Sequence, residues 1–160
     1  MVRAMDESVV RSMAKWPNVP DVYGWLSLDR RGNWLLKGER IGNQALKDFI
    51  ARNYTSDPQG RWYFQNGPQR VFVQLAYTPL VVHFEGEALL DHCGRPFQAE
   101  QAFLDDEGSV LMLGKPGIGL LDDRDLAAYA DRAADRAAGL PGIAPGAVPG
   151  RFGFAANPSP

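Results

Sequence analysis

The chain has 160 residues, of which 45% are hydrophobic and 22% are charged, a composition typical of a globular protein with a core of its own. Its net charge of -2 gives no general attraction to nucleic acid, and its single cysteine, Cys93, excludes an intramolecular disulfide. The N-terminal region has no long apolar run, so we expect a soluble cytoplasmic protein without a membrane segment.

The first expected elements are a short helix and a strand. Asp6 is suited to cap a helix that runs to about residue 15, where Pro17 ends it. Residues 22–28 then alternate in the manner of a strand, and this alternation places Trp25 on the face opposite Leu26.

A turn pattern recurs along the chain. Asp29-Arg30-Arg31-Gly32 fits a type I turn followed by a glycine at positive φ, an arrangement found in hairpins. The same Asp-x-x-Gly pattern begins again at Asp57, Asp91 and Asp105. Four copies predict a turn that is used repeatedly between strands. Their irregular spacing argues against a propeller or a solenoid, which would show one fixed period.

A central hairpin is expected over residues 61–75, where two β-rich runs flank the turn-forming pair Asn66-Gly67. Before it, the spacing predicts a helix over residues 44–53 with Asn43 as its N-cap. The apolar positions of that helix predict one buried stripe, made of Ala45, Leu46, Phe49 and Ile50.

In the C-terminal half we expect further strands from Leu80 to residue 113, and then a loop over residues 115–119. Asp122 or Asp123 is suited to cap a final helix that ends at about Ala138. Residues 139–160 contain Pro-Gly pairs every four residues and little apolar content, which indicates a mobile tail.

These elements predict an α+β fold. We expect an antiparallel β-meander of hairpins with two helices packed on one side and a short N-terminal helix. Residues 1–138 would form a single domain, followed by a Pro/Gly-rich tail over residues 139–160.

Several stretches of the N-terminal half resemble a family of small proteobacterial proteins of unknown function. The stretches are Lys15-Trp16-Pro17-Asn18-Val19-Pro20, Tyr23-Gly24-Trp25-Leu26, Asp29, Gly32, Trp34, residues 49–54 and Phe64-Gln65-Asn66-Gly67-Pro68-Gln69-Arg70-Val71. The resemblance covers roughly residues 14–75. It implies a bacterial cytoplasmic protein, and it implies no catalytic residue because the family has no assigned activity.

The candidate ligand-binding residues are aromatic and polar side chains of the expected strands and of the hairpin tip at residues 66–70. They are Trp25, Trp34, Trp62, Asn66, Gln69 and Arg70. A hairpin tip with amides, a rigid proline and a guanidinium presents fixed polar groups that can orient a ligand. The spacing of histidine, cysteine and acidic residues matches no metal motif, so neither a metal site, a cofactor nor a catalytic residue is predicted.

The function that these features favour is a non-enzymatic binding or interaction module for a protein or a small molecule, with self-association as a further possibility. One alternative is a small hydrolase that uses His83 and nearby carboxylates; a deep pocket around His83 with a carboxylate within hydrogen-bond reach would favour it. The other is a stacking platform for a nucleotide or single-stranded nucleic acid, made of aromatic residues among Arg30, Arg31, Arg61 and Arg70. A core filled by large rings explains those aromatic residues more simply.

Overall fold

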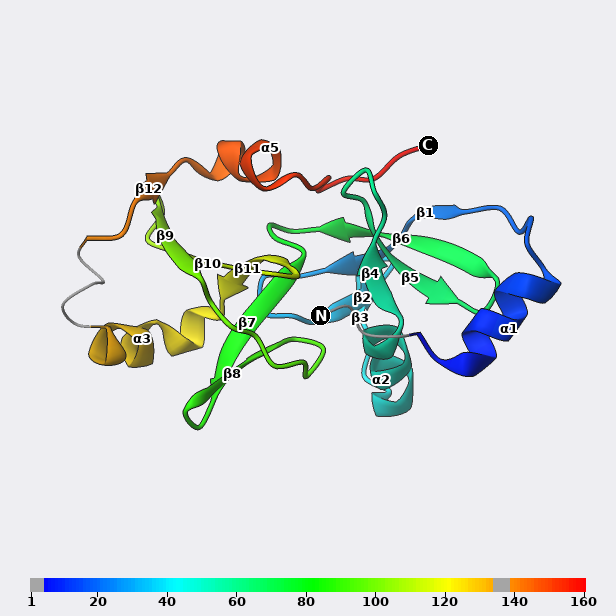
Figure 1. The fold of residues 1–160 in the computed structure, drawn as a ribbon, viewed down its shortest axis with the longest axis horizontal. Helices are drawn as coiled ribbons and strands as arrows, with labels where there is room; N and C mark the ends of the chain where they lie inside the picture. The colour runs from blue at the N-terminus through cyan, green and yellow to red at the C-terminus, as the bar shows by residue number, and fades with distance from the viewer. Residues whose placement is uncertain (1–4, 134–138) are drawn as a thin grey trace. The chain divides into compact units, whose positions relative to one another are not determined.

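The computed structural model describes residues 5–133 and 139–160 (Figure 1). The chain divides into two compact units. Unit 1 comprises Met1–Asp29, Asn33–Ala76 and Gly153–Pro160, and unit 2 comprises Arg30–Gly32 and Tyr77–Phe152. This division differs from the expected single domain over residues 1–138. Each unit contains one six-stranded sheet.

Unit 1 has two helices and a sheet in the order β3-β2-β1-β6-β5-β4. Its elements are α1 (Glu7–Lys15), β1 (Val22–Leu28), β2 (Trp34–Leu36), β3 (Glu39–Arg40), α2 (Gln44–Arg52), β4 (Tyr54–Ser56), β5 (Trp62–Asn66) and β6 (Gln69–Leu75). The core is aromatic: Trp34, Tyr54 and Trp62 contact one another through Tyr54 and are all buried. On α2, Phe49 packs edge-on against Phe64 of β5.

Unit 2 has a sheet in the order β12-β9-β10-β11-β7-β8. Its elements are β7 (Leu80–Glu85), β8 (Ala88–Asp91), β9 (Gln101–Asp105), β10 (Val110–Gly114), β11 (Gly117–Leu121), the 3-10 helix η1 (Asp123–Asp125), α3 (Leu126–Arg132), β12 (Gly142–Ile143), the 3-10 helix η2 (Pro145–Ala147) and α5 (Val148–Phe152). Its core is mainly aliphatic, with Leu80, Val82, Leu111, Ile118 and Leu121 almost inaccessible to solvent.

The α+β class is confirmed, but the simple meander is wrong in one respect. In each sheet the last strand of a three-stranded meander pairs in parallel with the first long strand of the unit: β6 with β1, and β11 with β7. A parallel pair needs a long crossover, so it joins residues that are distant in sequence and leaves no local pattern. The two expected covering helices also belong to different units, since α2 lies in unit 1 and α3 in unit 2.

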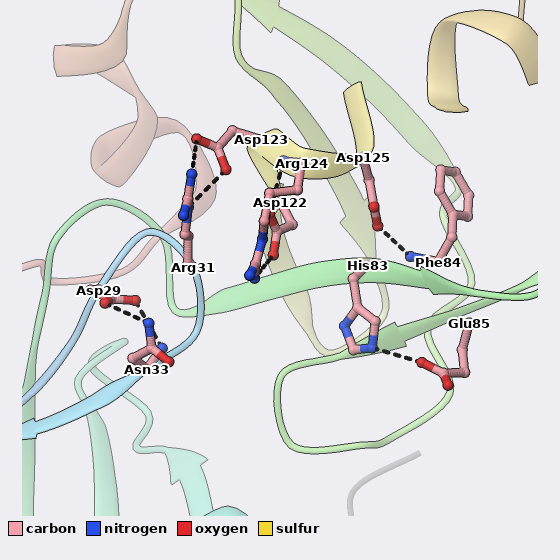
Figure 2. A network of polar contacts seen from close by, with 10 residues as sticks. All are labelled: Asp29, Arg31, Asn33, His83, Phe84, Glu85, Asp122, Asp123, Arg124 and Asp125. Carbon is pink, nitrogen blue, oxygen red and sulfur yellow. Dashed lines mark hydrogen bonds and ion pairs between the residues drawn. The ribbon is translucent and has the colours of Figure 1, made fainter. Parts of the chain in front are cut away.

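The four Asp-x-x-Gly turns form as predicted. The carboxylates of Asp29, Asp57, Asp91 and Asp105 each accept a hydrogen bond from the backbone N–H four residues on, at 2.8 to 3.0 Å. The glycine of each copy has a φ between 77° and 85°, a conformation that glycine adopts without strain. Figure 2 shows the first copy, in which Asn33 also donates its side-chain amide to Asp29.

The central hairpin forms one residue later than expected. Asn66 pairs with Gln69, so the two loop residues are Gly67 and Pro68 rather than Asn66 and Gly67. Gly67 has a φ of 56°. A type II′ turn requires a positive φ only at its first central residue, which suits glycine, and Pro68 can occupy the second because its ring fixes a negative φ.

Helix α2 begins and ends close to its predicted limits, and the side chain of Asn43 accepts a hydrogen bond from the N–H of Leu46. The predicted buried stripe is only half correct. Ile50 is buried and Phe49 is half-buried, whereas Ala45 and Leu46 are exposed. The exposed side of this stripe becomes part of the groove described below.

The C-terminal half departs from its predictions at two places. Residues 117–119, expected in a loop, belong to β11, because Gly114 and Gly117 pair across a two-residue turn at Lys115-Pro116. The final helix is capped by Asp122 as predicted, but it starts as the 3-10 turn η1 and α3 ends at Arg132. The remainder of the expected helix, residues 134–138, lies outside the described residues.

Residues 139–160 contain regular elements where a mobile tail was expected. Strand β12 pairs with β9, and Val148 of α5 is fully buried. Phe154 is also buried, and Ala155 forms an isolated parallel bridge with Arg61. A few well-spaced apolar residues are therefore enough to fix this Pro/Gly-rich segment onto its two sheets, although its average composition is poor in them.

Within residues 5–133 and 139–160, no helix combines the length and the apolar character that a membrane span requires.

Candidate ligand-binding groove

An apolar groove opens in unit 1 between α2 and the sheet, with a volume of about 440 Å³. Strands β1, β2, β5 and β6 supply its floor, and Leu46 and Ile50 of α2 supply one wall. The lining residues are Val22, Trp25, Leu26, Leu36, Ile41, Leu46, Ile50, Phe64, Asn66, Gln69 and Val71. The volume lies within the range of about 300 to 1,000 Å³ that is usual for small-molecule sites.

Several large apolar side chains that line the groove are exposed to solvent. Trp25 is 48% exposed, Leu36 45% and Leu46 40%. A single exposed apolar residue is ordinary on a protein surface, but three around one concavity mark a site whose burial by a ligand would be favourable.

A bulge in β1 turns Trp25 toward the groove. The pairing of β1 with β6 shifts register between Val22 and Leu26, and Gly24 in that interval has a φ of 79°. In a regular strand Trp25 and Leu26 would point to opposite faces, as predicted from the alternation, yet both line the groove. Re-aiming one side chain is a known effect of a bulge, and here it places a tryptophan at the groove wall.

Two amide side chains from the β5–β6 hairpin are the polar part of the lining. Asn66 and Gln69 are paired residues, so both lie next to the Gly67-Pro68 turn at one end of the groove. Gln69 donates a hydrogen bond of 3.3 Å to the carbonyl oxygen of Pro20, which holds its side chain in place. Amides beside an apolar wall can orient a ligand by hydrogen bonding.

A lysine outside the lining contacts the tryptophan of the groove. The Nζ atom of Lys37 is 3.8 Å from the centre of the Trp25 ring, and the backbone N–H of Lys37 donates to the Trp25 carbonyl at 2.8 Å. Lys37 follows Leu36, which pairs with Leu26. The ammonium therefore stands beside the exposed tryptophan of the groove.

The six residues proposed from the sequence divide into two sets. Trp25, Asn66 and Gln69 line the groove together. The other three residues do not line the groove. Trp34 and Trp62 are buried in the core, and the guanidinium of Arg70 lies 4.0 Å from the centre of the Tyr63 ring.

Sequence reasoning missed the aliphatic part of the lining, which includes Leu36, Ile41 and Leu46. Leu46 was expected to be buried because helical spacing cannot tell a contact with the core from an open wall. For Leu36, the pair Leu35-Leu36 in a short strand offered a signal, because adjacent strand residues point to opposite faces and one of them must lie outside the core.

Unit 2 contains a polar cavity of about 410 Å³ that includes His83. Its lining residues are Arg31, Gly32, Val81, His83, Phe84, His92, Asp122, Arg124 and Asp125. Figure 2 shows His83 with Arg31, Phe84, Asp122, Arg124 and Asp125 of this lining. The Nε2 atom of His83 is 3.4 Å from Glu85 at the end of β7, and His92 accepts a hydrogen bond from the N–H of Val81 through Nδ1. This is the location in which the hydrolase alternative would have to operate.

The carboxylates around this cavity are engaged in structural contacts. Asp122 accepts two hydrogen bonds from the Arg124 guanidinium, at 2.9 and 2.6 Å, and Asp125 accepts one from the N–H of Phe84 at 2.8 Å. The hydrogen bonds from Arg124 hold the pKa of Asp122 below its ordinary value despite its burial. Glu85, the carboxylate next to His83, is largely exposed, so this pair lies at the surface and not in an enclosed site.

Among the residues that the structure describes, no group of three or more histidine, cysteine or acidic side chains is placed to hold a metal ion.

A family model described as "Protein of unknown function (DUF2946)" matches residues 5–159. Among solved structures, the chain is similar to a DUF1285 family protein from Silicibacter pomeroyi DSS-3, with a TM-score of 0.54, 17% identity and 74% of each chain covered. It is also similar to a DUF1285 family protein from Shewanella baltica OS155, with a TM-score of 0.51, 17% identity, and coverage of 66% of this chain and 90% of that chain. At this identity the likeness shows a shared fold alone. A search of curated proteins gave no match.

Proposed function

Because the chain belongs to the family described as "Protein of unknown function (DUF2946)", whose description assigns no activity, we propose a function from the groove itself. The protein is a non-enzymatic binding module that holds one small organic molecule with an apolar body in the groove of unit 1. The observation that carries this proposal is the gathering of Trp25, Leu36 and Leu46, all exposed, around one concavity of ligand size.

The energetics favour an apolar occupant. Removing a leucine-sized side chain from water contributes about 1.5 to 3 kcal/mol, and a ligand in the groove would cover parts of three such side chains. The cost of binding is reduced because β-strands and a capped helix hold the walls before the ligand arrives. Asn66 and Gln69 then supply orientation rather than most of the affinity.

The test uses N-phenylnaphthylamine, an uncharged apolar dye whose fluorescence rises on leaving water. The wild-type protein should bind it, and Leu46→Gln should weaken binding about tenfold, which corresponds to the loss of one leucine contact. Val10→Gln is the matched control, because Val10 is an exposed aliphatic residue of α1 outside the groove lining. Equal dye affinity in the two variants would show that the dye binds elsewhere and would refute the proposal.

Native mass spectrometry of the protein as purified complements the dye. A retained small molecule in the wild-type protein that is absent from Leu46→Gln would identify the ligand directly. The same spectrum reports the assembly state, so it also tests self-association, the other kind of partner that the sequence suggested. A protein-sized partner would appear as a heteromeric mass instead.

We further propose a cytoplasmic location. The chain has one cysteine, Cys93, so it contains no second cysteine with which an intramolecular disulfide could form. Small secreted domains commonly rely on disulfides, and this chain has none to rely on. Fractionation of cells that express the full chain would test the proposal, and recovery outside the cytoplasmic fraction would contradict it.

A further inference from the structure

Lys37 has an unfavourable backbone conformation. It is the only residue other than glycine with a positive φ in the described part of the chain, at 50°. Lys37 and Gly38 are the two loop residues between Leu36 and Glu39, and both have positive φ values, as a type I′ turn requires. Asn, Asp and Gly are the usual residues at such positions, so a lysine here reduces the stability of the turn.

The conformation places a positive charge next to Trp25, although Lys37 itself is not a lining residue of the groove. With the backbone N–H of Lys37 bound to the Trp25 carbonyl, its ammonium lies over the Trp25 ring, which lines the groove. Lys37 forms no ion pair with any residue in the described part of the chain. A strained residue that holds a charge without an ion-pair partner beside the wall of a concavity indicates a site for a group of opposite charge.

The register of the sheet sets the two ends of the site. Val22 pairs with Val71, two residues after Gln69, whereas Leu26 pairs with Leu36, the neighbour of Lys37. Because β1 is bulged in this interval, the separation is counted along β6, where Gln69 lies four residues before Val73, the partner of Leu26, or about 13 Å of strand away. Between them the lining is apolar.

We propose that the ligand is an amphipathic carboxylate. Its carboxylate lies beside the Lys37 ammonium, and its apolar body extends along Leu26 and Leu36 toward Asn66. This inference rests on the proposed function and names the chemical class of the molecule that the groove takes.

The test compares decanoate with decanol, which share an alkyl chain and differ in charge, by calorimetric titration at low salt. Lys37→Asn removes the charge and puts a residue that tolerates positive φ in its place, so the turn is kept. It should lower the affinity for decanoate about fivefold and affect decanol far less, since a solvent-exposed charge pair has that magnitude. Lys37→Arg should retain the preference, and added salt should reduce it in the wild-type protein.

Arg40→Gln is the control for long-range charge, because Arg40 is an exposed cation of the same hairpin that pairs with Leu35 across β2 and β3. It should leave the affinity for decanoate close to the wild-type value. Equal losses for decanoate in Lys37→Asn and Arg40→Gln, or equal losses for both ligands in Lys37→Asn, would overturn the inference. So would a wild-type protein that binds N-phenylnaphthylamine but not decanoate, whereas failure to bind the dye at all would count against the groove as a binding site.

Discussion

At the scale of single residues, the Asp-x-x-Gly turns show how a short pattern determines local structure. In the second copy, Asp57 accepts hydrogen bonds from the N–H groups of Gln59 and Arg61 and from the Arg61 guanidinium. One buried carboxylate thus satisfies several donors that would otherwise face the interior of the loop. This explains why the turns were predictable from four residues, without reference to the rest of the fold.

Gly60 is required in this turn for two reasons that can be separated. Its φ is 77°, and a Cβ at this position would lie 3.0 Å from the Cα of Phe154 and closer still to the carbonyl of Gly153. Gly38 has a φ of 83° but open space around it. Gly38→Ala should therefore lower the free energy of unfolding by about 1 kcal/mol, the cost of positive φ alone.

Gly60→Ala should lower the free energy of unfolding by roughly 3 kcal/mol, because the 153–155 segment must also move. Urea titration of both variants measures the difference. Equal losses would mean that the backbone of Gly153 and Phe154 yields freely to the added methyl group.

Asp57 also makes stability depend on pH. Burial would raise the pKa of its carboxyl, but the hydrogen bonds from Arg61 and Gln59 outweigh burial and lower the pKa below the ordinary value of 3.8. A carboxyl whose pKa is lower in the folded state stabilises the protein above the unfolded-state value, and this contribution is lost as the pH falls through the folded-state value.

The free energy of unfolding should therefore decrease as the pH drops through 3.8 and below. Asp57→Asn should show a shallower decrease than the wild-type protein when both are unfolded in urea across this range. Asp21→Asn, at an exposed position of the same unit, should retain the wild-type slope. A wild-type slope in Asp57→Asn would assign the acid sensitivity to other groups.

At the scale of elements, the sequence predicted what depends on neighbouring residues. Helix α2, its Asn43 cap and most strands follow from periodicity and turn residues. The parallel pair β1–β6 could not be predicted, because its partners are distant in sequence. Strand β11 was missed because its first three residues are Gly117, Ile118 and Gly119. A short run that contains two glycines is typical of a loop, and only the pairing with β10 and β7 identifies it as a strand.

The groove was predictable only in part for the same reason. Asn66 and Gln69 could be identified because a hairpin tip is a local feature. Trp25 joins them only because β1 is bulged near Gly24. Trp34 and Trp62 do not join them, because the pairing of the strands buries both in the core. The sequence therefore indicated the polar end of the candidate site, and the fold supplies its walls.

At the scale of the whole molecule, the two units share one pattern. Asp57, Gly60 and Pro68 recur 48 residues later as Asp105, Gly108 and Pro116. In both places an Asp-x-x-Gly turn joins the first two strands of a meander, and a two-residue turn ending in proline joins the second to the third. The spacing of all four turns did not reveal this correspondence, because the copies at Asp29 and Asp91 have no equivalent 48 residues away.

Unit 1 depends on residues from the far end of the described chain. The N–H of Leu75 donates to the carbonyl of Ala156, and the N–H of Ala155 donates to that of Gly60. Phe154 is buried in the same segment. Deletion of residues 153–160 should therefore destabilise unit 1 by roughly 3 kcal/mol, from one buried aromatic ring and two backbone hydrogen bonds.

Hydrogen exchange of the deletion variant measures this effect by unit. Amides of β5 and β6 should exchange faster than in the full chain, while those of β10 and β11 should keep their protection. Faster exchange that is confined to β10 and β11 would contradict the assignment of this segment to unit 1.

The order of segments within unit 1 has a consequence for biosynthesis. Domains generally fold as they leave the ribosome, with the N-terminal one first. Here the strands of unit 1 are translated early, yet Gly153–Pro160, which belongs to the same unit, follows all of unit 2 in the chain. Until translation passes residue 156, the carbonyl of Gly60 and the N–H of Leu75 therefore lack the partners that they have in the folded protein, so the unit that is synthesised first is the last to be completed.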